Sequence, residues 1–261
     1  MRTDGFHPQI LKFCAYTGLA FAFLWPFAAI VVSNGQYILP PSAADSAHKV
    51  VADYLANTTG IRIATVIFIF SSILYTTWSA SITQMVRRRE RQWPILFNIM
   101  LISVACEVVV VMFIGFFWGA ASWRPGETSH EVTQAFNDLG WLGVLFTGAP
   151  FALFQLALAA SILMDNSPRP AYPRWSAYFN LFASFFMCEA CLLLFFKTGP
   201  FSQNGLLVFY VPMIVFFVWI VAFSVLTVRA INAEATAGPW VAEAPEHMPA
   251  GGRTPTGRQL S

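Results

Sequence analysis

Two glutamates, Glu107 and Glu189, each lie within a long apolar stretch of the sequence. Each follows by fourteen residues a tryptophan, Trp93 or Trp175, of the kind that marks a membrane interface. At about 1.5 Å per helical residue, both carboxyl groups are expected at one depth, about 21 Å from that interface. A carboxyl group there costs on the order of 2.5 to 3.5 kcal/mol, so it usually faces the bundle interior and often serves function. The pair predicts a ligand or proton site.

Three kinds of chemistry fit these two carboxyl groups. They can engage the polar end of a lipophilic molecule, or bind a cation. As neighbours they can share one proton and relay it, because two close carboxylates do not ionise independently. The structural alternative is a protonated glutamate that is hydrogen-bonded between helices. The sequence leaves these alternatives open.

A second pattern pairs acidic and imidazole side chains at i, i+3 spacing outside the apolar stretches. Asp45 precedes His48 by three residues, and Glu127 precedes His130 in the same way. Two such pairs on helices can converge on a divalent metal ion. Helix capping and solvation explain the same residues without a metal. The four residues are therefore a metal-site hypothesis.

The sequence contains no motif that names a reaction. It has no glycine-rich phosphate loop and no Ser/His/Asp set. Its four cysteines all fall in apolar stretches, where their default role is small apolar filler. No cofactor is indicated, and the pattern leans away from an enzyme.

The elements that carry these residues are predicted to be transmembrane helices. Hydrophobic residues make up 57% of the 261 positions and charged residues 11%, which excludes an ordinary soluble enzyme. About 20 apolar residues cross a bilayer. Six such spans are predicted, at 11–32, 61–85, 94–119, 140–164, 175–197 and 206–229.

Charge predicts the orientation of these spans. With both termini in the cytoplasm, eleven of the fifteen lysines and arginines lie on the cytoplasmic side, as the positive-inside rule requires. Arg87, Arg88, Arg89 and Arg91 form the densest group. The net charge of +2 gives no reason to expect a nucleic-acid partner.

The chain resembles itself at an offset of 82 residues. This pattern predicts an all-α bundle of three hairpins with the same orientation, 11–92, 93–174 and 175–231, related by an axis along the membrane normal. Residues 1–231 form one domain, and 232–261 are expected to be a disordered cytoplasmic tail. The matching pairs include Trp93 with Trp175, Asn98 with Asn180, Cys106 with Cys188, Glu107 with Glu189 and His48 with His130.

Local signals refine the bundle. Short outer loop helices are expected at 42–55, with Ser42 as N-cap, and at 127–138. Prolines inside helices should kink them. They are Pro26, Pro150 and Pro212. Aromatic belts at the interfaces are expected from Trp93, Trp118, Trp123, Trp141 and Trp175.

Three segments carry a resemblance to a known group. FNDLGW (136–141), PRPAYPRWSAYFNL (168–181) and FFKTGPFSQNGLLVFYVP (195–212) resemble a family of six-helix bacterial membrane proteins of unknown function. The resemblance implies a bacterial inner membrane location. It carries no activity over to this chain.

The combined expectation is a protein that binds or passes a small lipophilic ligand within its bundle, using Glu107 and Glu189. One alternative is an accessory subunit of a larger membrane complex. Another is a proton- or cation-coupled transporter that uses the same two glutamates. The expected partners are membrane lipids, a lipophilic small molecule, and a membrane protein or further copies of the chain.

Overall fold

The computed structural model describes residues 7–90 and 94–237. Within them, six helical segments are long and apolar enough to cross a membrane, which confirms the predicted multi-pass architecture. Lipid contact follows from these spans. The six segments are Pro8–Val32, Thr58–Arg87, Ile95–Trp123, His130–Met164, Arg174–Leu194 and Leu206–Thr236.

Helices account for the regular structure of the described residues, and no strand occurs among them. The α-helices are α1 (Pro8–Phe27), α2 (Ala47–Ala56), α3 (Thr58–Arg87), α4 (Ile95–Trp123), α5 (His130–Phe146), α6 (Ala149–Met164), α7 (Arg174–Glu189) and α8 (Val211–Ala237). Short wider or tighter turns are η1 (Ala28–Val32), η2 (Ala190–Leu194) and η3 (Leu206–Tyr210).

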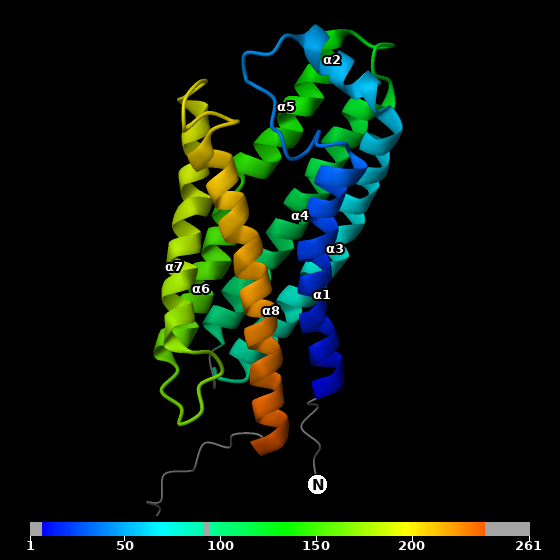
Figure 1. The fold of residues 1–261 in the computed structure, drawn as a ribbon. Helices are drawn as coiled ribbons and strands as arrows, with labels where there is room; N and C mark the ends of the chain where they lie inside the picture. Colours follow the sequence, from blue (N-terminus) through cyan, green and yellow to red (C-terminus); the bar gives the residue numbers. More distant parts are fainter. Residues whose placement is uncertain (1–6, 91–93, 238–261) are drawn as a thin grey trace, which may run out of the picture.

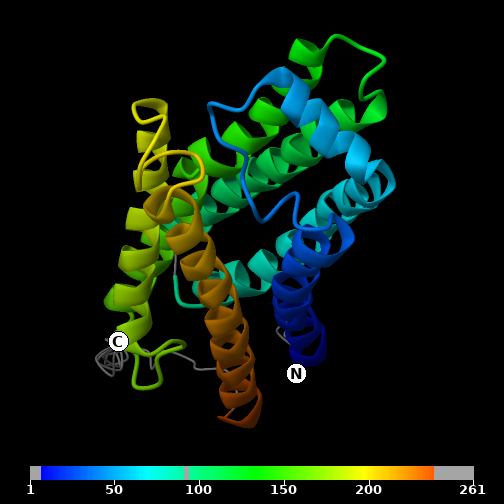
Figure 2. The same ribbon diagram turned by 45° about the horizontal axis from the view of Figure 1, so that its top comes forward.

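The spans pack round the bundle in chain order. Neighbours are α1 with α3, α3 with α4, α4 with α5 and α6, α6 with α7, and α7 with α8, and α8 closes the ring against α1. The colours in Figure 2 follow this circuit. In Figure 1, the start of α1 and the end of α8 lie at the same end. The ring is compatible with three hairpins, while the 82-residue repeat and the cytoplasmic side remain predictions.

The three prolines coincide with helix irregularities. Pro26 lies in the last turn of α1, and the π-helical turn η1 follows directly. Pro150 is in the first turn of α6, after the break that ends α5 at Phe146. Pro212 is in the first turn of α8, directly after the π-helical turn η3. The cause is that proline donates no backbone hydrogen bond and its ring crowds the preceding turn.

The outer loop helices begin at other residues than expected. In α2 the N-cap is Ser46, whose hydroxyl accepts from the Lys49 N–H at 3.4 Å, and not Ser42. The Ser42 N–H instead bonds the Asp45 carboxylate at 3.2 Å in the preceding turn. The helix expected at 127–138 is no separate element, because α5 runs from His130 directly into the fourth span.

Two of the expected interface tryptophans lie in the core. Trp118 and Trp141 are buried, and their rings contact each other with centroids 5.2 Å apart. A Cβ on Gly140 would lie 2.4 Å from the Trp118 ring, so glycine permits this close approach of α5 to α4. Trp123 and Trp175 are 69% and 55% exposed, as an aromatic belt requires.

The last span extends beyond the expected domain end at residue 231. Helix α8 continues to Ala237, and Glu234 in this extension forms ion pairs with Arg88 and Arg89. These contacts hold the last turns of α8 beside the end of α3, and the division into a domain and a tail stays a prediction. The rest of the expected tail, 238–261, lies outside the described residues, as do Arg91 and Trp93.

Candidate functional site

Glu107 is fully buried in the middle of α4. The Tyr75 hydroxyl on α3 donates a hydrogen bond to its Oε2 atom at 2.6 Å. The other carboxyl oxygen, Oε1, is buried without a hydrogen-bond partner among the described residues. Helix α4 places Glu107 inward because it packs against α3 on one side and against α5 and α6 on the other. The carboxyl group faces the bundle interior, as the sequence predicted.

A second polar layer lies one helical turn from the Tyr75–Glu107 pair. Because α3 and α4 are antiparallel, the residues one turn further toward the arginine-rich end are Ser79 on α3 and Ser103 on α4. On α6 the Phe151 ring contacts Tyr75 with centroids 6.0 Å apart, and Gln155 follows one turn later. Polar atoms of all three residues of this layer are buried without a hydrogen-bond partner among the described residues.

An apolar central cavity adjoins the same pair. Its volume is about 70 Å³, and its lining comes from all six spans. Val111 and Ile114 line it from α4, on the same helical face as Glu107, and Tyr75 lines it from α3. Tyr75 therefore has its ring in the cavity wall and its hydroxyl on Glu107.

Glu189 has a different environment. It is the last residue of α7 and is half-buried, with Oε2 buried and unpartnered among the described residues. Met187, two residues before it, and Ala190, the next residue, line the central cavity, whereas Glu189 itself does not. No hydrogen bond joins Glu107 and Glu189 in the described chain.

The two asparagines that match in the repeat also differ. Asn180 is buried on α7, and its Oδ1 accepts from the Trp219 indole N–H at 2.8 Å. Its Nδ2 donates to the Ser176 carbonyl at 2.9 Å. Asn98 is exposed on α4. An interhelical hydrogen bond is therefore present at Asn180, where α8 supplies the indole.

The outer loops bring the two predicted histidines together. The rings of His48 on α2 and His130 on α5 have centroids 4.2 Å apart. Their acidic neighbours do not complete a metal site: the Asp45 carboxylate pairs with Lys49 at 3.2 Å, and Glu127 is exposed in the turn before α5. In the residues that the structure describes, no group of three or more His, Cys, Asp or Glu side chains could hold a metal ion.

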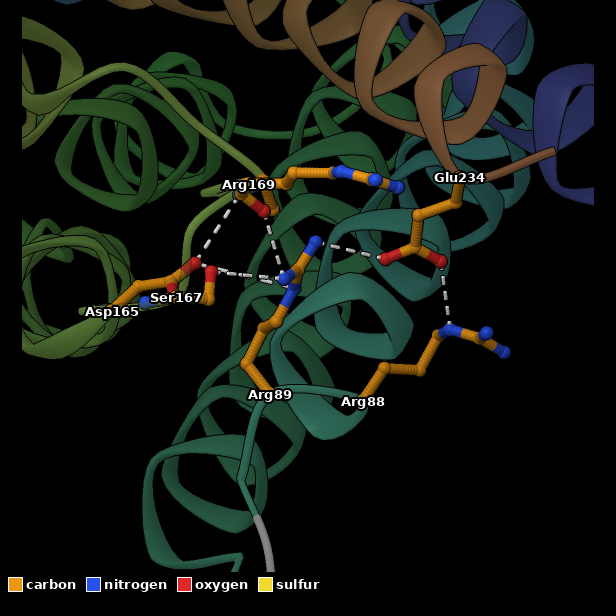
Figure 3. A network of polar contacts seen from close by, with 7 residues as sticks. Arg88, Arg89, Asp165, Ser167, Arg169 and Glu234 are labelled. Carbon is orange, nitrogen blue, oxygen red and sulfur yellow. Dashed lines mark hydrogen bonds and ion pairs between the residues drawn. The ribbon is translucent and has the colours of Figure 1, made fainter. Parts of the chain in front are cut away.

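A polar network closes the opposite end of the bundle (Figure 3). Arg89, just past the end of α3, donates to Glu234 at 3.0 Å and to the Arg169 carbonyl at 3.0 Å. The other Glu234 oxygen accepts from Arg88 at 2.9 Å. Asp165 lies 4.0 Å from Arg89 Nε. One guanidinium thus joins three segments: the end of α3, the loop between α6 and α7, and the end of α8.

Sequence reasoning missed Tyr75 and the contacts of Arg89. The arginines were used only to predict topology, although Glu234 is the one acidic residue of α8 and so the available partner on that helix. For Tyr75 the available signal was a single tyrosine among the serines and threonines of the second span. No sequence pattern indicates which of these polar side chains faces Glu107.

Comparison with protein-family models, with curated proteins and with solved structures finds no match to this chain. The family suggested by the sequence resemblance and the bacterial inner membrane location therefore remain predictions. What is established is a multi-pass helical membrane protein with a buried Tyr75–Glu107 pair beside an apolar cavity.

Proposed function

We propose that this protein binds a small lipophilic molecule in its central cavity. The observation that carries the proposal is the cavity itself, whose lining is apolar, rich in aromatic side chains and contributed by all six spans. Ligand sites are typically concave and apolar, with a few polar groups that fix orientation. The lining includes Phe21, Trp25, Phe68, Val111, Met187 and Phe216.

The Tyr75–Glu107 pair supplies the polar group of this site. The Tyr75 hydroxyl is held by the 2.6 Å hydrogen bond to Glu107, and this bond fixes the tyrosine ring in the cavity wall. A hydroxyl group at one end of a lipophilic ligand can donate to the Tyr75 oxygen, whose own proton is given to Glu107. Glu189, between two cavity-lining positions of the chain, is the second carboxyl group in this proposal.

Native mass spectrometry of protein extracted gently from its own membrane tests the proposal. We expect a co-purifying lipophile of defined mass. Val111→Phe, which fills the cavity from α4, should abolish co-purification of this lipophile. Val109→Phe is the matched control, because Val109 is half-exposed on the same helix and does not line the cavity.

Retention of the same ligand by Val111→Phe would overturn the central-cavity site. Recurrent protein partners without any ligand would instead favour an accessory subunit of a membrane complex. The apolar side chains exposed on the spans would then contact the partner as well as lipid.

Proton- or cation-coupled transport is a second candidate, and the unpartnered polar layer favours it. Buried polar atoms cost free energy unless they are paired, so Glu107 Oε1, Ser79 and Gln155 form an environment suited to a cation, a proton or internal water. Ion flux in vesicles should fall in Glu107→Gln if this candidate is correct. Unchanged flux in Glu107→Gln combined with Glu189→Gln would exclude it.

The proposed location is the bacterial inner membrane with both termini in the cytoplasm. The arginine-rich loops lie at the same end as the start of α1 and the end of α8, which supports this orientation through the positive-inside rule. A cysteine introduced at Gly199, in the loop at the opposite end, should react with an impermeant thiol reagent in whole cells. One introduced at Ser167 should react only after permeabilisation.

A further inference from the structure

We propose that the arginine-rich end of the bundle contains a binding site for the phosphate group of an anionic phospholipid. The site is a pocket of about 280 Å³, formed by the end of α3, the loop between α6 and α7, and the last turns of α8. It is separate from the central cavity, so its failure would leave the proposed function untouched.

The charge of the pocket selects an anion. Three arginines and one glutamate line it, a formal charge of +2: Arg89, Arg169, Arg229 and Glu234. Glu234 is already engaged, since its two oxygens accept from Arg88 at 2.9 Å and from Arg89 at 3.0 Å. It therefore cannot neutralise the other arginines without losing these bonds.

Two of the three lining arginines have free guanidinium groups. Arg169 and Arg229 are exposed, and within residues 7–90 and 94–237 neither side chain forms an ion pair or a hydrogen bond. Figure 3 shows the Arg169 side chain extending over the Arg89–Glu234 pair. The Arg169 backbone is held by the bond from Arg89 to its carbonyl. Planar guanidinium groups bind phosphate oxygens in a bidentate manner, which suits this pair.

The remaining lining is apolar and indicates a lipid rather than a free ion. Leu226 and Ala230 on α8 and Pro170 and Ala171 in the loop form this part of the wall. An inorganic phosphate gains nothing from such a surface, whereas a phospholipid places its glycerol and the first acyl carbons there. Basic pockets between transmembrane helices on the cytoplasmic side have this chemistry.

The position relative to the spans also fits a headgroup. Helix α7 and the fifth span both begin at Arg174, one residue after Pro173, which lines the pocket. The sixth span ends at Thr236, two residues after Glu234, which also lines it. The pocket therefore lies where spans meet the membrane surface. The start of α7 adds the partial positive charge of a helix N-terminus.

The test is lipid titration of the full chain in mild detergent, followed by native mass spectrometry. The probes are phosphatidylglycerol, phosphatidylcholine with the same acyl chains, and glycerol 3-phosphate. We expect saturable binding of phosphatidylglycerol, weaker binding of phosphatidylcholine, and little binding of glycerol 3-phosphate. Arg169→Gln combined with Arg229→Gln should weaken phosphatidylglycerol binding about 30-fold.

Lys12→Gln, compared with the single variant Arg229→Gln, is the matched control. It removes one positive charge at the same end of the bundle, and Lys12 does not line the pocket. Equal losses in these two single variants would mean general attraction to a basic surface and would overturn the site. Equal binding of the two lipids would overturn it as well. If glycerol 3-phosphate competes as strongly as the lipid, the ligand is a soluble phosphate ester, and the assignment to a lipid is wrong.

Both substituted arginines are exposed, and neither side chain forms a hydrogen bond or an ion pair among the described residues, so the variant should fold normally. Size-exclusion elution and melting temperature check this directly. Arg229→Lys, which keeps the charge and loses the planar fork, should retain part of the affinity.

Discussion

Glu107 and Glu189 occupy matching positions 82 residues apart in the sequence, yet their environments differ. Glu107 is fully buried in the middle of the long helix α4 and accepts a hydrogen bond from Tyr75. Glu189 is half-buried at the last residue of α7, where the helix tightens into η2. Matching positions in the sequence therefore do not give equal positions in a helix or equal burial.

The difference arises from the neighbouring helices. Helix α4 packs on α3, α5 and α6, whereas α7 packs on α6 and α8. The residue 82 positions after Tyr75 is Ala157, which has no hydroxyl group to donate. The carboxyl group of Glu107 is thus stabilised by a hydrogen bond, whereas that of Glu189 is stabilised by partial exposure. Of the two glutamates, only Glu107 forms a fully buried polar site.

The largest expected effect is on stability when the two glutamates are truncated. Glu107→Ala should lower the free energy of unfolding by about 2 to 4 kcal/mol, because it leaves a cavity and an unpaired buried Tyr75 hydroxyl. Glu189→Ala should change it by less than about 0.5 kcal/mol. Reversible unfolding in mixed micelles measures both. Equal losses would break the comparison.

A double-mutant cycle measures how much the Tyr75–Glu107 hydrogen bond contributes to this difference. Tyr75→Phe and Glu107→Leu should show a coupling free energy of about 0.6 kcal/mol and at most about 1.7 kcal/mol, the average and the maximum found for hydrogen bonds between transmembrane helices. Tyr178→Phe, at an exposed tyrosine of α7, should show no coupling to either glutamate. Additive effects of the first pair would mean that the bond contributes nothing to stability.

The asparagine pair repeats the comparison with a smaller effect. Asn180→Leu removes the acceptor of the Trp219 indole and should cost about 1 kcal/mol. Asn98→Leu, at an exposed position, should be neutral within about 0.5 kcal/mol. Similar costs at both positions would show that the matching residues are equivalent after all.

The smallest effect is expected at the outer histidines, where matching residues meet. His48→Ala should remove the ring contact with His130 and raise the rate of amide hydrogen exchange in α2 severalfold. Global stability should change by no more than about 0.5 kcal/mol, since His48 is exposed. Unaltered exchange in α2 would mean that the contact does not hold the loop helix.

Apolar run length was sufficient to predict the six spans, whereas the side of the membrane on which the arginine-rich loops lie stays a prediction from charge. Proline chemistry located the irregular turns near Pro26, Pro150 and Pro212. Element ends were less predictable. Ser42 and Ser46 are both good N-caps by residue type, and only the path of the preceding turn, with the Ser42 N–H on Asp45, makes Ser46 the cap.

The sequence by itself determined that six apolar helices cross a membrane, because hydrophobic length and the cost of unpaired backbone groups in lipid leave no other solution. It also determined that a buried carboxyl group would need a partner. Only the tertiary structure decided that the partner of Glu107 is Tyr75, that Trp118 and Trp141 are core residues, and that Arg89 joins α3 to Glu234. The reason is that these choices depend on helix rotation and on which helices are neighbours, and hydropathy does not specify either.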